Sequence, residues 1–211
     1  MTSGEKALKD LHERMLNCRR CLEAGYDITP KAIFSGKYGA KIMVIGQAPG
    51  VTEVEVGRPF NAGSGKRLFQ WLESAGFDES SFRSKQYMTS VTKCFPGKAE
   101  NGSGDRVPSR NEQALCRPFL NEEINLINPL MIIPIGRLAI NLFFPSNLPL
   151  WKIIGTESWA DHRPIIPFPH PSGASRWHQV EKNRIKIEKS IQLIRNCLDQ
   201  IPFETNLLSL D

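Results

Sequence analysis

Four cysteines are spaced as they would be in a metal centre. Cys18 and Cys21 form a C-x-x-C pair in "NCRRCL", Cys94 ends the stretch "TSVTKC", and Cys116 lies in "ALCRPFL". Four thiolates bind zinc tetrahedrally or hold an iron–sulfur cluster. Unrelated thiols would also pack well in a core. We expect Cys197, in an amphipathic stretch, to be a core or surface residue outside any metal centre. The spacing of the other four favours a metal centre and leaves zinc and iron–sulfur open.

A second group of residues could bind a ligand through its backbone. The apolar run "KIMVIG" leads directly into Gly46-Gln47-Ala48-Pro49-Gly50, a turn without an acid, a thiol or a hydroxyl. Small residues let another molecule approach the backbone closely. The later stretch "NAGSGKR" superficially resembles a phosphate-binding loop, but that motif needs glycine where Phe60 stands and serine or threonine where Arg67 stands. Nucleotide binding through this loop is therefore disfavoured.

The elements that must position these residues follow from the pattern of apolar runs. Runs at 41–46, 87–93, 130–136 and 163–169 read as strands, and the segments with helical spacing are 5–16, 64–76, 110–127, 137–144 and 176–200. Near-continuous apolar strands separated by helices predict an α/β fold. We expect one domain over residues 1–211, a three-layer α/β/α sandwich around a four-stranded, mainly parallel sheet.

This fold would bring three motifs together. Ligands of open α/β sheets lie outside the carboxyl ends of the strands. The segments at those ends are "GQAPG", "TSVTKC" and "HPSGASRW". We therefore predict that they converge at one edge of the sheet.

Composition narrows the class of partner. The 211 residues carry a formal charge of +5, which is a mild indication of a polyanionic partner. Apolar content of 40% and charged content of 23% are typical of a globular protein. The chain lacks the ~18 consecutive apolar residues of a membrane helix, and its N-terminus lacks the apolar core of a secretory signal. We expect a cytoplasmic protein with no membrane partner, and a monomer.

Taken in order, the motifs resemble those of the uracil-DNA glycosylase superfamily, and most closely its iron–sulfur family 4. The resemblance runs from Cys18 to the last predicted helix, and six motifs in one order are highly specific. The matching segments are the C-x-x-C pair, "GQAPG" with Glu53, "GRPF", "TSVTKC", "CRPFL" and His170-Pro171.

The resemblance implies a role for each motif. It implies that Cys18, Cys21, Cys94 and Cys116 hold a [4Fe-4S] cluster rather than zinc, and that the partner is DNA containing a damaged base. Such enzymes flip the base into a pocket before cutting its bond to deoxyribose. The implied base-binding residues are Gly46, Gln47, Ala48, Phe60, Ser90 and His170. His170 would stabilise the departing base, and Ser172, Gly173, Ala174, Ser175 and Arg176 would insert into the duplex.

The sequence departs from family 4 at two positions of this site. Gln47 replaces a glutamate implied to position the attacking water, and an amide cannot accept a proton at neutral pH. Ser90 replaces an asparagine implied to read the uracil edge. Asn61 is our candidate for a second water-holding residue, with Glu53 behind it. The segment 97–107 is also longer than is typical of family 4.

These departures leave two hypotheses. The first is a DNA glycosylase of base excision repair that removes a deaminated base, uracil by default and hypoxanthine or xanthine as alternatives. The second is a lesion-binding module of the same fold with weak catalysis.

Overall fold

The computed structural model describes residues 1–100, 104–173 and 175–200. Within this part of the chain, one sheet contains five strands: β1 (Ile42–Gly46), β2 (Tyr87–Ser90), β3 (Met131–Pro134), β4 (Ser158–Ala160) and β5 (Arg163–Ile165). Their order is β2-β1-β3-β5-β4, and every neighbouring pair is parallel except β4 and β5. The prediction of four strands was therefore wrong, because the sheet has five. β4 is a three-residue edge strand whose sequence, Ser-Trp-Ala, gives no apolar run to detect.

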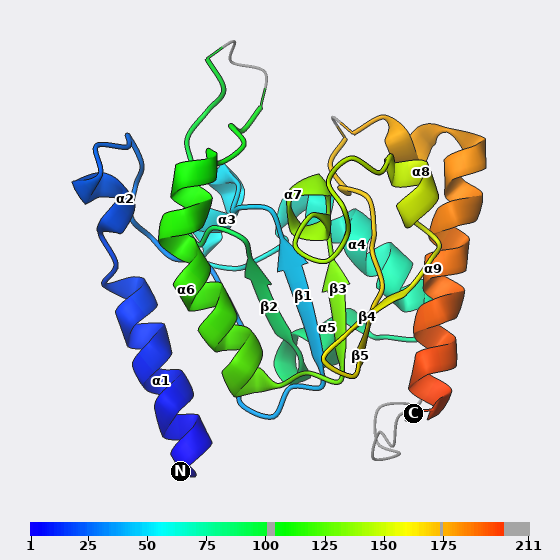
Figure 1. Cartoon of the computed structure of the whole chain (residues 1–211), viewed down its shortest axis with the longest axis horizontal. Coiled ribbons are helices and arrows are strands. Elements are labelled where there is room, and N and C mark those ends of the chain that lie inside the picture. Colours follow the sequence, from blue (N-terminus) through cyan, green and yellow to red (C-terminus); the bar gives the residue numbers. More distant parts are fainter. Residues whose placement is uncertain (101–103, 174, 201–211) are drawn as a thin grey trace.

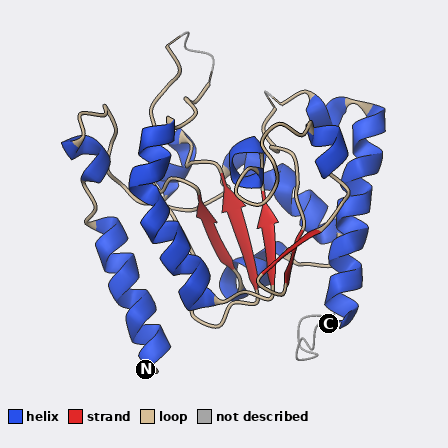
Figure 2. Ribbon diagram, in the orientation of Figure 1, coloured by secondary structure: helices blue, strands red, loops and turns tan. Residues whose placement is uncertain are grey.

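Helices cover both faces of this sheet, which confirms the predicted three layers (Figures 1 and 2). One face packs against α4 (Ala62–Ser74), α5 (Glu79–Lys85) and α9 (Glu181–Gln200). The other face packs against α1 (Ser3–Leu16), α6 (Arg110–Ile127) and α7 (Arg137–Ile140). The remaining short helices are α2 (Arg20–Glu23), α3 (Val51–Val56), α8 (Leu150–Ile153) and the 3-10 turn η1 (Trp177–Gln179).

Local signals in the sequence explain where the longer helices begin and end. Thr2 and Ser109 each close a capping box, with Glu5 and Glu112 respectively, so that α1 and α6 start where their first amides find side-chain acceptors. α6 ends at Ile127, and its C-cap residue Asn128 has a left-handed conformation (φ 45°) that stops the helix. The predicted helix 176–200 begins only at Glu181, because η1 and a turn at Val180 precede it.

The sheet topology creates a crevice at the end of β1. From β1 the chain goes to β2 on one side and later to β3 on the other, so β1 lies at the point where the strand order reverses. Ligands of open α/β sheets bind at this switch point. In Figure 1 the arrowheads of β1, β2 and β3 point toward the edge at which α6 begins. The turn "GQAPG" follows β1 directly at this edge.

Among the described residues, no helix has both the length and the apolar character that crossing a membrane requires.

Candidate active site at the carboxyl edge of the sheet

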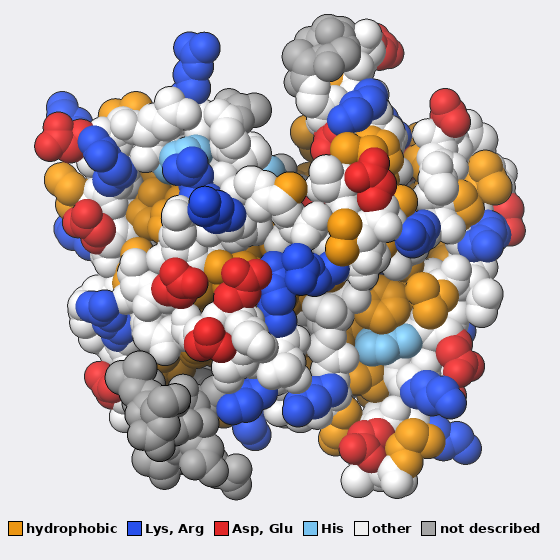
Figure 3. Space-filling view, turned by 180° about the vertical axis from the view of Figure 1, so that it is seen from behind, with side chains coloured by type: hydrophobic (Ala, Val, Ile, Leu, Met, Phe, Trp, Pro, Cys, Tyr) orange, Lys and Arg blue, Asp and Glu red, His pale blue; other side chains and the backbone are white. Residues whose placement is uncertain are grey.

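A cavity of about 530 Å³ opens at this edge, and the three predicted motifs line it together. Figure 3 shows from behind that the surface is hollowed at this edge, with Lys and Arg side chains on both sides of the hollow. The predicted residues at the cavity wall are Gly46, Gln47, Ala48, Phe60, Asn61, Ser90, His170, Ser172 and Ser175. The predicted convergence of "GQAPG", "TSVTKC" and "HPSGASRW" is therefore confirmed as a matter of geometry.

Phe60 is held rigidly over the floor of this cavity. Its ring lies so close to Gly46 that a Cβ on that glycine would come within 2.9 Å of the ring tip. Its backbone has a positive φ of 50°. The Glu53 carboxylate accepts the Phe60 N–H, and the Arg83 guanidinium donates to the Phe60 carbonyl at 2.7 Å. Gly65 is needed beneath it, because a Cβ there would lie 1.8 Å from the Phe60 oxygen.

His170 presents a defined tautomer to the cavity. The Ser172 backbone N–H donates to Nδ1 at 3.3 Å, and the Ser172 hydroxyl lies 2.9 Å from the same nitrogen. Because Nδ1 accepts a hydrogen bond, the proton of the neutral ring is on Nε2. Burial lowers the pKa of His170, with a smaller opposing contribution from Asp105. The ring is therefore neutral at pH 7, and its free group is an Nε2–H donor.

Two neighbouring polar residues have their hydrogen-bonding roles fixed by the backbone. The Gln47 side-chain oxygen accepts the Leu138 N–H of α7 at 3.1 Å, so its free group is the NH2 donor. The Ser90 hydroxyl donates to the Thr92 carbonyl at 2.7 Å, so its free sites are lone pairs. Gln47 thus offers a donor and Ser90 offers an acceptor.

Asn61 and the "HPSGASRW" loop are only partly engaged with the cavity. Asn61 lines it, but its side-chain oxygen accepts from Arg58 at 2.9 Å. In the loop, the Ser175 N–H donates to the Ser172 carbonyl at 3.1 Å, and Gly173 has open space around its Cα. Trp177 packs against the core, so its position suits an anchor of the loop. Arg176 precedes η1, and Ala174 lies outside the described residues.

The four cysteines of the predicted metal centre surround a second, smaller cavity. Its lining includes Cys18, Cys21, Cys94 and Cys116, with apolar neighbours such as Met15 and Phe119. Burial and the neighbouring sulfurs raise the pKa of Cys21 to about 11 and that of Cys94 to about 12. The described residues contain no group of three or more His, Cys, Asp or Glu side chains placed to hold a metal ion.

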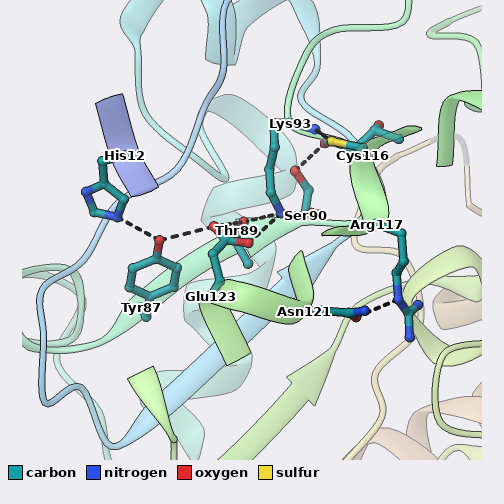
Figure 4. Close-up of polar contacts among 10 residues, drawn as sticks. His12, Tyr87, Thr89, Ser90, Lys93, Cys116, Arg117, Asn121 and Glu123 are labelled. Carbon is teal, nitrogen blue, oxygen red and sulfur yellow. Dashed lines mark hydrogen bonds and ion pairs between the residues drawn. The ribbon is translucent and has the colours of Figure 1, made fainter. Parts of the chain in front are cut away.

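A buried polar network connects the two cavities, and sequence reasoning did not find it (Figure 4). Lys93 is 2% exposed and its ammonium lies 2.6 Å from the carboxylate of Glu123, which is fully buried. The same ammonium donates to the Thr89 hydroxyl at 2.8 Å and to the Ser90 carbonyl at 2.5 Å. The Lys93 backbone N–H donates to the Cys116 sulfur at 3.3 Å. The sequence offered one indication of this network, namely that Lys93 and Glu123 are charged residues in segments predicted to pack in the core.

The class of protein follows from comparison with known families. The model of the uracil DNA glycosylase superfamily matches residues 33–194, and the chain belongs to this superfamily.

Several individual uracil-DNA glycosylases are similar to this chain over much of its length. The chain is 30% identical over 190 residues to a type-4 uracil-DNA glycosylase of Thermotoga maritima, and the aligned residues make up 89% of this chain and 93% of the relative. It is 34% identical over 183 residues to a type-4 uracil-DNA glycosylase of Saccharolobus solfataricus, covering 79% and 76% respectively. A type-5 uracil-DNA glycosylase of Pyrobaculum aerophilum is 26% identical over 156 residues, or 62% of this chain and 66% of the relative.

Proposed function

We propose that this protein is a DNA glycosylase that hydrolyses the bond between a deaminated base, uracil by default, and deoxyribose, leaving an abasic site. The observation that carries the proposal is the cavity that combines Phe60, Ser90 and His170 at the switch point of the sheet. The relatives named as uracil-DNA glycosylases support the same reaction.

Each of these residues has a chemical task in the proposed reaction. The Phe60 ring provides a flat apolar surface for a flipped base. The Nε2–H of neutral His170 donates a hydrogen bond to the base as negative charge develops on it. A donor placed where charge develops contributes about 10²–10³ in rate. Backbone amides of the "GQAPG" turn and the Gln47 NH2 supply further donors to the base oxygens.

The hydrogen bonding of Ser90 would favour deaminated bases in the cavity. Its hydroxyl proton is committed to the Thr92 carbonyl, so toward a ligand it acts as an acceptor. Uracil carries an N–H on its pairing edge, as do hypoxanthine and xanthine. Cytosine and adenine carry a lone pair at the equivalent nitrogen, which would face the Ser90 lone pairs and leave both unpaired. We therefore propose hypoxanthine and xanthine as alternative substrates.

The cysteine cavity fits an iron–sulfur cluster, and we propose that Cys18, Cys21, Cys94 and Cys116 hold [4Fe-4S]. Four thiols share one apolar cavity, and one sulfur already accepts a backbone N–H, as cluster ligands do. The choice of an iron–sulfur cluster over zinc rests on the similarity to family 4. A cluster held by these cysteines would tie the N-terminal segment to the segment that follows β2 and to α6.

The test of the activity uses oligonucleotides that carry uracil, hypoxanthine or xanthine, followed by alkaline cleavage of abasic sites. Strand breaks with any of them would support the glycosylase, whereas tight binding without breaks would favour a lesion-binding module. His170→Ala should lower the rate at least 100-fold. His162→Asn, a change at an exposed histidine outside the cavity, is the matched control.

The test of the cofactor is the absorbance of the purified protein at about 400 nm, together with iron, sulfide and zinc analysis. Cys94→Ala should abolish the absorbance, and Cys197→Ala, a change at a buried cysteine of α9, should leave it. A colourless protein that contains zinc would contradict the proposed cluster.

A further inference from the structure

The turn after β1 cannot supply a base for the attacking water. The Gln47 oxygen is occupied by the Leu138 N–H, and its NH2 group can only donate. Water that attacks a sugar carbon needs an acceptor for its proton, within hydrogen-bond reach. The acceptor must therefore come from another part of the cavity wall.

Two carboxylates line the described part of this wall, Glu53 and Asp105. Glu53 is already used by the backbone, because one oxygen accepts the Gly50 N–H at 2.6 Å and the other accepts the Phe60 N–H. Moving Glu53 would release the Phe60 backbone. This leaves Asp105 as the carboxylate with acceptor capacity to spare.

Asp105 reaches the "GQAPG" turn from the 97–107 loop. Its Oδ2 atom lies 2.9 Å from the position that a Cβ would occupy on Gly50, the last residue of the turn. Its Oδ1 atom pairs with the Lys98 ammonium at 2.7 Å. Burial lowers the pKa of His170 and raises that of Glu53; the Asp105 charge opposes the first shift and adds to the second. The absence of a side chain at Gly50 makes room for this carboxylate.

The arms of the loop hold Asp105 in this position. The Ala99 N–H donates to the Gly104 carbonyl at 3.0 Å, and the Arg106 N–H donates to the Gly97 carbonyl at 2.9 Å. The Arg106 guanidinium makes two hydrogen bonds to the Glu112 carboxylate, at 2.7 and 2.8 Å. Asp105 is therefore next to a residue that is fastened to the start of α6.

We infer that Asp105 is the general base of the glycosylase, replacing the acid that is missing at Gln47. This inference rests on the proposed function. In the step, the water oxygen bonds to the sugar carbon C1′, and the bond from C1′ to the base nitrogen breaks with its electron pair going to the base. The water proton passes to Asp105 Oδ2 and later to solvent. The departing base anion is stabilised by the His170 Nε2–H.

The experiment compares Asp105→Asn with the wild-type chain on a uracil duplex, with enzyme in excess so that one turnover is observed. Loss of a general base lowers the rate by about 10²–10⁴, and we expect a fall of at least 100-fold. Binding to a duplex with a non-cleavable abasic analogue, followed by fluorescence anisotropy, should change less than threefold. Glu100→Gln, at an acid of the same loop that is not on the cavity wall, is the matched control.

Chemical rescue separates a base from a structural residue. Asp105→Ala leaves room for a small acid, so sodium formate should raise its rate at least fivefold over equal sodium chloride. Gln47→Glu added to Asp105→Asn should also restore part of the rate. An Asp105→Asn rate within threefold of wild type, or no response of Asp105→Ala to formate, would overturn this inference alone. No cleavage by the wild-type chain would overturn the proposed function, and this inference with it.

Discussion

The buried Lys93–Glu123 ion pair allows a quantitative prediction. Its two charges are 2.6 Å apart and almost wholly shielded from water. The Glu123 carboxylate also accepts hydrogen bonds from the Tyr87 and Thr89 hydroxyls, at 3.1 and 2.9 Å. When a buried charge loses its partner, the folded state is destabilised, because no water can take the place of the lost partner. The network therefore depends on both members being present.

Glu123→Gln should destabilise the protein by about 3–4 kcal/mol. The glutamine oxygen can still accept from the two hydroxyls, but its NH2 would face the Lys93 ammonium, donor against donor. We expect the lower part of the range because Lys93 keeps two acceptors, Thr89 and Ser90. For a chain of this length, the midpoint of thermal unfolding should fall by about 10 °C.

A double variant tests whether the cost comes from the unpaired charge. Lys93→Met combined with Glu123→Gln removes both charges and keeps a partner for the hydroxyls. It should recover most of the lost stability. The assay is thermal unfolding at pH 7, with all variants in the same state of metal loading.

The matched control for this experiment is Lys9→Met. The Lys9–Glu13 pair lies on the surface at 3.9 Å, with both side chains more than half exposed. Its removal should cost less than about 1 kcal/mol. A midpoint for Glu123→Gln within 2 °C of wild type, or a double variant as unstable as the sum of the single variants, would refute the reasoning.

Three further predictions concern single positions. Gly65→Ala would put a Cβ 1.8 Å from the Phe60 carbonyl oxygen, so the single-turnover rate should fall at least tenfold and the unfolding midpoint should drop. Burial lowers the pKa of His12 from 6.5 to about 4. Between these pH values His12 is protonated in the unfolded chain and neutral in the folded one. The contribution of His12 to the free energy of unfolding should therefore be fully present above pH 6.5 and be lost as the pH falls toward 4. After allowance for partial exposure the loss by pH 4.5 is about 1 kcal/mol, and His12→Gln should flatten the pH dependence of the midpoint. Ser90→Ala removes the acceptor that we propose for the base N–H and should slow uracil excision about tenfold; an unchanged rate would contradict that role of Ser90.

The parts of the fold that depend on periodicity were predictable, and those that depend on single contacts were not. The apolar runs located β1, β2, β3 and β5, and the helical spacing located α6 at its observed bounds. The rule that ligands bind at the carboxyl ends of parallel strands predicted that "GQAPG", "TSVTKC" and "HPSGASRW" would lie close together. The edge strand β4 was missed because a strand of three residues has no period to detect.

In the candidate site, too, the contacts of single side chains could not be predicted from the sequence. Residue types identified Gln47 and Ser90 as departures from the family pattern, but their hydrogen-bonding roles depend on Leu138 and Thr92. Those partners follow from tertiary position and not from spacing in the sequence. Asp105 was visible as an acid in an unusual loop. Only the fold brings it within reach of the turn at Gly50.

The cysteine cavity and the cavity at the carboxyl edge of the sheet share one short segment of chain. From residue 89 to residue 94 the chain carries Ser90 at one cavity and Cys94 at the other. Lys93 stands between them, with its backbone N–H on the Cys116 sulfur and its ammonium on the Ser90 carbonyl. Fixing the cysteines would therefore also fix Ser90, the acceptor that we propose for the base N–H. A metal centre held by these cysteines would therefore help to position Ser90 through the backbone of residues 90–94.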